Sequence, residues 1–130
     1  MKIKSLSILT TALIMGFSSC NTDDTEVQGP VITLTTPTDQ KDYEIGDTIF
    51  IHGDITDNEG LHELMVMVYQ QESGNTILDY TPTVHDIPSF HIDTFVLPTD
   101  TVHVHYHLKI EAWDHDNNAD SLNYTLHWAD

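Results

Sequence analysis

Three alternating histidines in residues 101–114 are the clearest chemical signal in the sequence. His103, His105 and His107 are separated by one residue each, so in a β-strand they face the same side. Imidazoles bind zinc, copper and nickel. Side chains on one strand face repeat at about 6.6–6.8 Å, so three of them span about 13 Å. Metal–nitrogen bonds are only about 2.0–2.1 Å long, so we expect two of these histidines plus a residue from another strand.

His127, in the expected last strand at residues 121–128, is the first choice to complete this site. If the last hairpin pairs apolar residues with apolar residues throughout, its register places His107 opposite His127. A shift of two residues keeps the same faces and brings His127 opposite His105 or Lys109 instead.

Three further residues are secondary candidates for the same site, namely Met67, His85 and His91. Met67 is expected on the other flanking strand, and its thioether would favour Cu(I), whereas imidazoles alone suit zinc or copper. Two other interpretations of the histidine row remain open. It is a solvated, pH-responsive face, or it is a surface that contacts a protein partner.

The elements that must position these residues are short strands. Residues 101–114 alternate strictly, with an apolar set from Val102 to Ala112 on one face. Similar segments are separated by Gly, Pro, Asn and Asp, and no segment has a helical period. The expected strands are 31–36, 48–54, 61–71, 76–84, 90–97, 101–114 and 121–128.

Seven short strands indicate an all-β fold, an immunoglobulin-like antiparallel β-sandwich. We expect this domain to occupy residues 31–130. The disulfide of antibody domains is absent, because the only cysteine is Cys20.

Acidic loops offer a second type of site. In such a sandwich the loops at 54–60 and 114–120 emerge at the same end. They carry carboxylates that are possible calcium ligands, namely Asp57, Glu59, Asp114 and Asp116. Neither loop has the EF-hand spacing, and Asp and Asn are also ordinary turn residues. Calcium is therefore the less favoured ion.

The N-terminus predicts export and lipidation. Residues 1–19 combine a basic start, a short apolar run and small residues, which is typical of a signal peptide rather than a membrane span. Cys20 occupies the position of the lipidated cysteine in bacterial lipoproteins, although an ordinary cleaved signal is the alternative. Residues 20–30 are polar and acidic, and we expect a flexible tether. The expected location is the outer membrane, lipid-anchored, on the cell surface or the periplasmic face.

The charge balance excludes some partners. The chain has 21 acidic residues against four Lys and Arg, a formal charge of −17, together with nine histidines. Nucleic acids and anionic lipid surfaces require clusters of Lys and Arg. We therefore expect no nucleic acid, and membrane contact through the lipid anchor only.

These motifs together resemble a known family. They are the lipobox, the Asp57-Asn-Glu-Gly-Leu61 and Asp114-Xaa-Asp-Asn-Asn118 turns, and the alternating histidines. The sequence resembles the small His-rich Bacteroidota lipoproteins grouped as domain of unknown function 4625. This resemblance implies an immunoglobulin-like fold on the cell envelope, and it implies no established activity.

The residues favour binding over catalysis. The sequence has no Gly-Xaa-Ser-Xaa-Gly elbow, phosphate loop or His-Glu-Xaa-Xaa-His helix. We therefore expect no enzyme, but a zinc- or copper-binding protein for metal capture, buffering or delivery to an envelope transporter. The alternative is a non-catalytic adhesion or accessory module that recognises a protein or glycan, with Trp113 as an outward aromatic platform.

Overall fold

The computed structural model describes residues 28–129, which contain seven strands and no helix. No helical segment in this range is therefore long and apolar enough to cross a membrane. The strands are β1 (Val31–Thr36), β2 (Lys41–Glu44), β3 (Ile49–Gln70), β4 (Thr76–Tyr80), β5 (Ile87–Val96), β6 (Val104–Asp114) and β7 (Ala119–Ala129). The predicted all-β class is confirmed.

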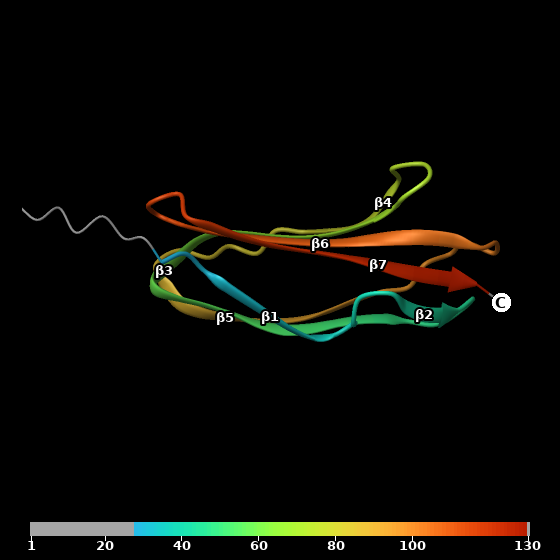
Figure 1. Cartoon of the computed structure of the whole chain (residues 1–130), viewed down its shortest axis with the longest axis horizontal. Helices are drawn as coiled ribbons and strands as arrows, with labels where there is room; N and C mark the ends of the chain where they lie inside the picture. The colour runs from blue at the N-terminus through green and yellow to red at the C-terminus, as the bar shows by residue number, and fades with distance from the viewer. Residues whose placement is uncertain (1–27, 130) are drawn as a thin grey trace, which may run out of the picture.

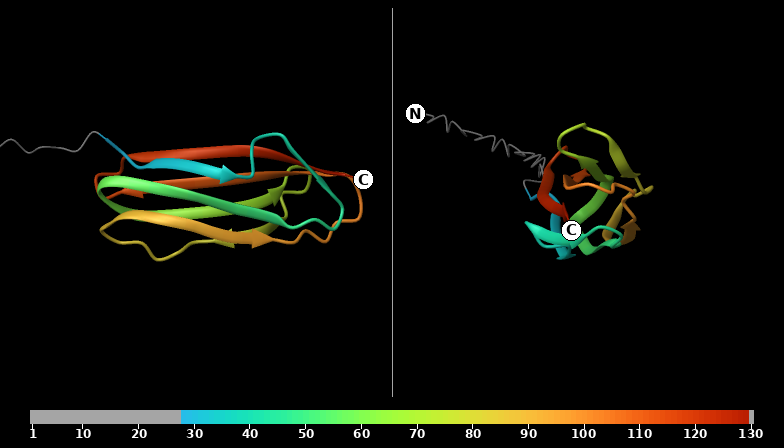
Figure 2. Two further views of the ribbon diagram at one scale, coloured as in Figure 1. Left: turned by 90° about the horizontal axis from the view of Figure 1, so that it is seen from below. Right: turned by 90° about the vertical axis from the view of Figure 1, so that its right-hand side faces the viewer.

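The long strand β3 organises the fold because it belongs to both layers. Its first half, up to Thr56, pairs with β1 and β5, and its second half, from Leu61, pairs with β4 and β6. β6 also pairs with β7, and β7 pairs with β2. Figure 1 shows β4, β6 and β7 in one layer and β1 and β5 in the other. In Figure 2 (left), β1, the first half of β3 and β5 run side by side.

Two expected strands are shorter than predicted, since β4 ends at Tyr80 and β6 begins at Val104, which leaves His103 outside the strand. Two other strand predictions were wrong. Residues 57–60 were expected to form a turn between two strands, but they lie within the continuous β3, at the irregularity where its pairing changes. The polar connection between the first two expected strands contains β2, which pairs with β7 in parallel. The sheet is therefore mixed rather than wholly antiparallel, and the immunoglobulin-like type stays a prediction.

The core lies between the layers and uses the predicted apolar face of the histidine-bearing strand. Tyr106, Leu108, Ile110 and Ala112 of β6 are all 0% exposed. They pack with residues of β3, β5 and β7, namely Ile51, Ile55, Val66, Val68, Ile92, Leu126 and Trp128. Each fully buried large side chain of this kind contributes about 1.5–3 kcal/mol. The opposite face of β6 therefore points outward on a rigid support.

Cys20 and the expected signal peptide lie outside the described residues, as does most of the expected tether. Their predicted roles stay predictions.

Candidate metal centre

The β6–β7 hairpin fixes which histidines face each other across the sheet. His105 is opposite His127, and His107 is opposite Thr125. The favoured register, with His107 opposite His127, was therefore wrong by two residues, and the alternative with His105 is the one observed. Both registers bury the same faces, so the core residues do not distinguish them.

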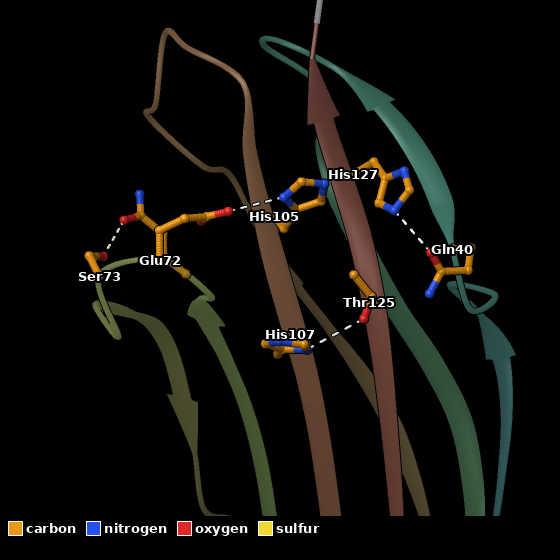
Figure 3. Close-up of polar contacts among 8 residues, drawn as sticks. Gln40, Glu72, Ser73, His105, His107, Thr125 and His127 are labelled. Carbon is orange, nitrogen blue, oxygen red and sulfur yellow. Dashed lines mark hydrogen bonds and ion pairs between the residues drawn. The ribbon is translucent and has the colours of Figure 1, made fainter.

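His105 lies between Glu72 and His127 (Figure 3), and His103 is a further neighbour. Its Nδ1 is 3.0 Å from Glu72 Oε1. The His103 and His127 ring centroids lie 4.9 and 5.0 Å from that of His105. The hydrogen bond from His105 lowers the pKa of the Glu72 carboxyl. His127 is itself held by Gln40, 3.0 Å from its Nε2.

The other predicted members of this site are spread out. The His107 ring contacts the Tyr69 ring in a tilted arrangement, with ring centroids 5.4 Å apart. Met67, on the predicted flanking strand, is opposite Lys109. His91 pairs with Asp54, 2.9 Å away. Within residues 28–129, the histidine row does not bring three metal-binding atoms within 4.8 Å of one another.

A different group of histidines meets that criterion. His62, His85 and His115 each offer one nitrogen, and these three atoms lie within 4.8 Å of one another. The closest rings are those of His62 and His115, with centroids 4.2 Å apart. The His85 centroid lies 4.8 Å from that of His115 and 5.6 Å from that of His62. We call these three residues the histidine cluster.

Backbone pairing around Leu61 explains why the cluster forms. Leu61 is 0% exposed and pairs with Asp114 of β6 and with Ile87 of β5. His62 follows Leu61, and His115 follows Asp114. His85 lies two residues before Ile87, in a segment fixed by the Asp86 amide, which donates to the Leu61 carbonyl oxygen at 2.9 Å. Three chain segments thus meet at one buried residue.

Asp86 connects two members of the cluster. Its Oδ1 lies 2.6 Å from His115 Nε2, and its Oδ2 lies 3.4 Å from His85 Nε2. A carboxylate in this position orients imidazoles that bind a metal through the other ring nitrogen. Asp86 has φ 54°, a left-handed conformation that Asp tolerates better than most residues.

Gly60 allows the Asp86 segment to approach β3. Its φ is 129°, and a Cβ atom there would lie 3.0 Å from the Asp86 Cα. The Gly60 amide also donates to Asp57 Oδ2 at 2.6 Å, which fixes the bend in β3. A glycine is therefore required here for both backbone conformation and space.

The cluster has the chemistry of a transition-metal site. Three imidazole nitrogens suit zinc or copper. Nitrogens around a tetrahedral zinc ion are about 3.3 Å apart, so small rotations of exposed side chains would close the cluster around an ion. The His62 Nδ1 is buried and has no hydrogen-bond partner among the described residues. A buried nitrogen without a partner is unusual and would be satisfied by a ligand.

Two of the four acidic residues proposed for calcium, Asp57 and Asp114, stabilise the local backbone instead. Asp57 Oδ2 accepts from the amides of Glu59 and Gly60. Asp114 is 2% exposed, and its two oxygens accept from the Asn118 amide at 2.8 Å and from Asn118 Nδ2 at 2.7 Å. Asp116 is exposed beside this turn. These hydrogen bonds favour the turn interpretation, and calcium binding stays a prediction.

Of the cluster, the sequence had suggested only His85, as a secondary candidate. His62 and His115 were missed, although a signal was present. His62 directly follows one turn motif, His115 lies inside the other, and both turns were expected at one end of the domain.

Comparison with known proteins supports the predicted family. The chain matches the family described as Domain of unknown function (DUF4625) over residues 18–127. It belongs to this family. The family description states no activity, and no curated protein matches the chain.

Proposed function

We propose that this member of DUF4625 binds a divalent transition metal, zinc or copper, through His62, His85 and His115. The observation that carries the proposal is the convergence of three imidazole nitrogens within 4.8 Å, from three separate segments. The imidazoles are also supported by a rigid backbone at the buried Leu61.

Asp86 prepares the site for metal. Its contacts with His115 and His85 orient both rings and raise their strength as ligands. With three protein nitrogens, the ion keeps one position for water or another donor. The Met67 thioether lies on β3 opposite Lys109, so it is not part of the proposed site, and divalent ions are favoured over Cu(I).

We propose that in the cell this chain is a lipid-anchored envelope protein, attached to the outer membrane through Cys20. The formal charge of −17 would raise the local concentration of cations around the domain. A small module with an exposed metal site suits capture or buffering of metal, and transfer to a transporter in the envelope. The exposed positions of His85 and His115 are consistent with such transfer.

Calorimetric titration of the metal-free protein with zinc and with copper(II) tests the proposal. Cys20→Ser should be used throughout, because a free thiol is itself a metal ligand. We expect one site of micromolar or tighter affinity. Replacing His62 and His115 by Ala should weaken it at least about 100-fold, since two of three ligands are lost.

Two matched variants make the result specific. His91→Ala removes another exposed, acid-paired histidine, and it should leave the affinity unchanged. His105→Ala with His127→Ala removes the pair predicted from the sequence. Loss of binding in this second variant, with binding retained in the His62 and His115 variant, would move the site to the histidine row. Affinity no tighter than millimolar in the original chain would refute metal binding.

A further inference from the structure

A cavity of about 320 Å³ lies beside the histidine cluster. Its floor is the outer face of the β3–β6 pair, where Met65 is opposite Glu111 and Glu63 is opposite Trp113. The segment 81–84 forms the remaining wall, including Pro82. The cavity shares His62 with the cluster, but most of its lining residues are not metal ligands. Its volume lies at the lower end of the range of small-molecule sites, about 300–1,000 Å³.

The lining combines an aromatic surface with negative charge. Trp113, Met65 and Pro82 are partly buried and provide apolar contact. Glu63 and Glu111 add two carboxylates. Glu111 is paired with Lys109 at 2.9 Å, whereas Glu63 lies 4.0 Å from His62. The carboxylate of Glu63 is therefore less engaged by a basic partner than that of Glu111.

We infer that this cavity binds a small organic ammonium compound. The indole of Trp113 attracts a cation through its π-electrons, and the carboxylates add charge complementarity. The methyl or methylene groups of such a compound would contact Met65 and Pro82. Anionic ligands are disfavoured by both glutamates and by the charge of the whole chain. This binding goes beyond the proposed metal function and does not require the metal.

Choline and its uncharged carbon isostere, 3,3-dimethyl-1-butanol, test the inference directly. The two probes have nearly the same shape and differ in charge. Binding is followed by NMR through the two indole N–H signals of the full chain, in the presence of EDTA. Trp128 serves as an internal reference, because it is 1% exposed and its Nε1 donates to the Asp100 carbonyl oxygen at 3.1 Å.

Choline is expected to shift the Trp113 signal saturably, with the Trp128 signal unchanged. The isostere should bind about tenfold more weakly or worse, as the charge is lost. Equal binding of both probes would overturn the ammonium assignment. No shift of Trp113 with choline up to about 100 mM, where even binding far weaker than millimolar is detected, would overturn the site itself.

The carboxylates are tested by Glu63→Gln with Glu111→Gln, compared with Glu44→Gln on β2. Both variants lose negative charge, but only the first changes the cavity. We expect choline affinity to fall about tenfold in the cavity variant and to change less than about twofold in the control. Equal affinity in the two variants would contradict the proposed role of the carboxylates. Because EDTA is present, failure here leaves the metal proposal untouched.

Discussion

The Nε2 atom of His115 lies 2.6 Å from Oδ1 of Asp86, although the two residues are far apart in the sequence. The second oxygen of the same carboxylate approaches His85 Nε2 at 3.4 Å. One acidic side chain thus holds imidazoles from two different chain segments. A carboxylate that holds one nitrogen of an imidazole orients the other toward a metal, so Asp86 would act as a positioning residue for the proposed site.

Replacing Asp86 by Asn should weaken metal binding without unfolding the domain. Asn tolerates the left-handed backbone conformation of Asp86 (φ 54°), and the side chain is 63% exposed. The amide keeps the shape but loses the charge that strengthens imidazole ligands. We expect zinc affinity to fall about 10–100-fold, measured by competition with a chelating dye. Unchanged affinity with a native circular dichroism spectrum would show that Asp86 does not support the metal.

Gly60→Ala should damage both the fold and the site. The new Cβ would lie 3.0 Å from the Asp86 Cα, and the backbone there has φ 129°. We expect a loss of about 1–3 kcal/mol in the free energy of unfolding, together with weaker zinc binding. Urea denaturation and zinc titration measure the two effects.

Gly74→Ala is the matched control for this prediction. Gly74 also has positive φ, 71°, but a Cβ there would meet no atom within 4 Å. The control should lower the free energy of unfolding by only about 1 kcal/mol, because of backbone strain, and it should leave zinc affinity unchanged. If both variants bind zinc equally well, the approach of Asp86 to Gly60 does not matter for the site.

The sequence predicted most of the fold because strand burial follows a local pattern. The alternation in residues 101–114 predicted a core face from Val102 to Ala112. Tyr106, Leu108, Ile110 and Ala112 are 0% exposed, but Val102 precedes β6 and is 62% exposed, so that part of the prediction was wrong. The same pattern could not determine the register of the last hairpin, because a shift of two residues leaves each face unchanged. Turn residues were equally ambiguous, since Asp57 and Gly60 form a bend inside β3 as readily as a turn between strands.

The candidate metal centre depends on long-range pairing that no local pattern contains. His62, His85 and His115 meet only because Leu61 pairs with both β5 and β6. The histidine row was prominent in the sequence, but three outward residues in a row span about 13 Å, too far to share one ion. Its two closest contacts link His105 with His103 and His127, at 4.9 and 5.0 Å between ring centroids.

Tyr106 should make the domain sensitive to alkali. Burial and the hydrogen bond that its hydroxyl donates to Asp100 raise its pKa well above the usual value of 10.0. The stabilising contribution is therefore complete below about pH 10 and is lost as the pH rises toward the folded-state pKa. The slope is about 1.4 kcal/mol per pH unit for one proton.

Tyr106→Phe provides the comparison for this alkaline effect. At pH 7 the variant should be about 1–2 kcal/mol less stable, because Asp100 loses a hydrogen-bond donor. Above pH 10 the difference from the original chain should shrink, since phenylalanine has no proton to lose. Urea denaturation between about pH 7 and pH 11 measures this. Curves that stay parallel across the range would exclude Tyr106 as the titrating group.

Glu72 offers a readout of whether His105 is available to a metal. The hydrogen bond from His105 Nδ1 lowers the pKa of this exposed carboxyl. Its contribution to stability is present above the unfolded-state pKa and is lost as the pH falls through the lower folded-state value. His105→Ala should raise the Glu72 pKa toward its usual value, whereas His127→Ala should leave it lowered. Carboxyl-carbon NMR titration distinguishes these outcomes.

The same carboxyl signal separates the two possible metal sites. Zinc bound at His62, His85 and His115 should leave the Glu72 titration unchanged, because Glu72 contacts His105 and is not part of the cluster. Zinc bound at the histidine row through His105 would place a positive charge beside Glu72, so the Glu72 pKa would change at one equivalent of zinc. Such a change would contradict the proposed location, even if the measured affinity were as tight as expected.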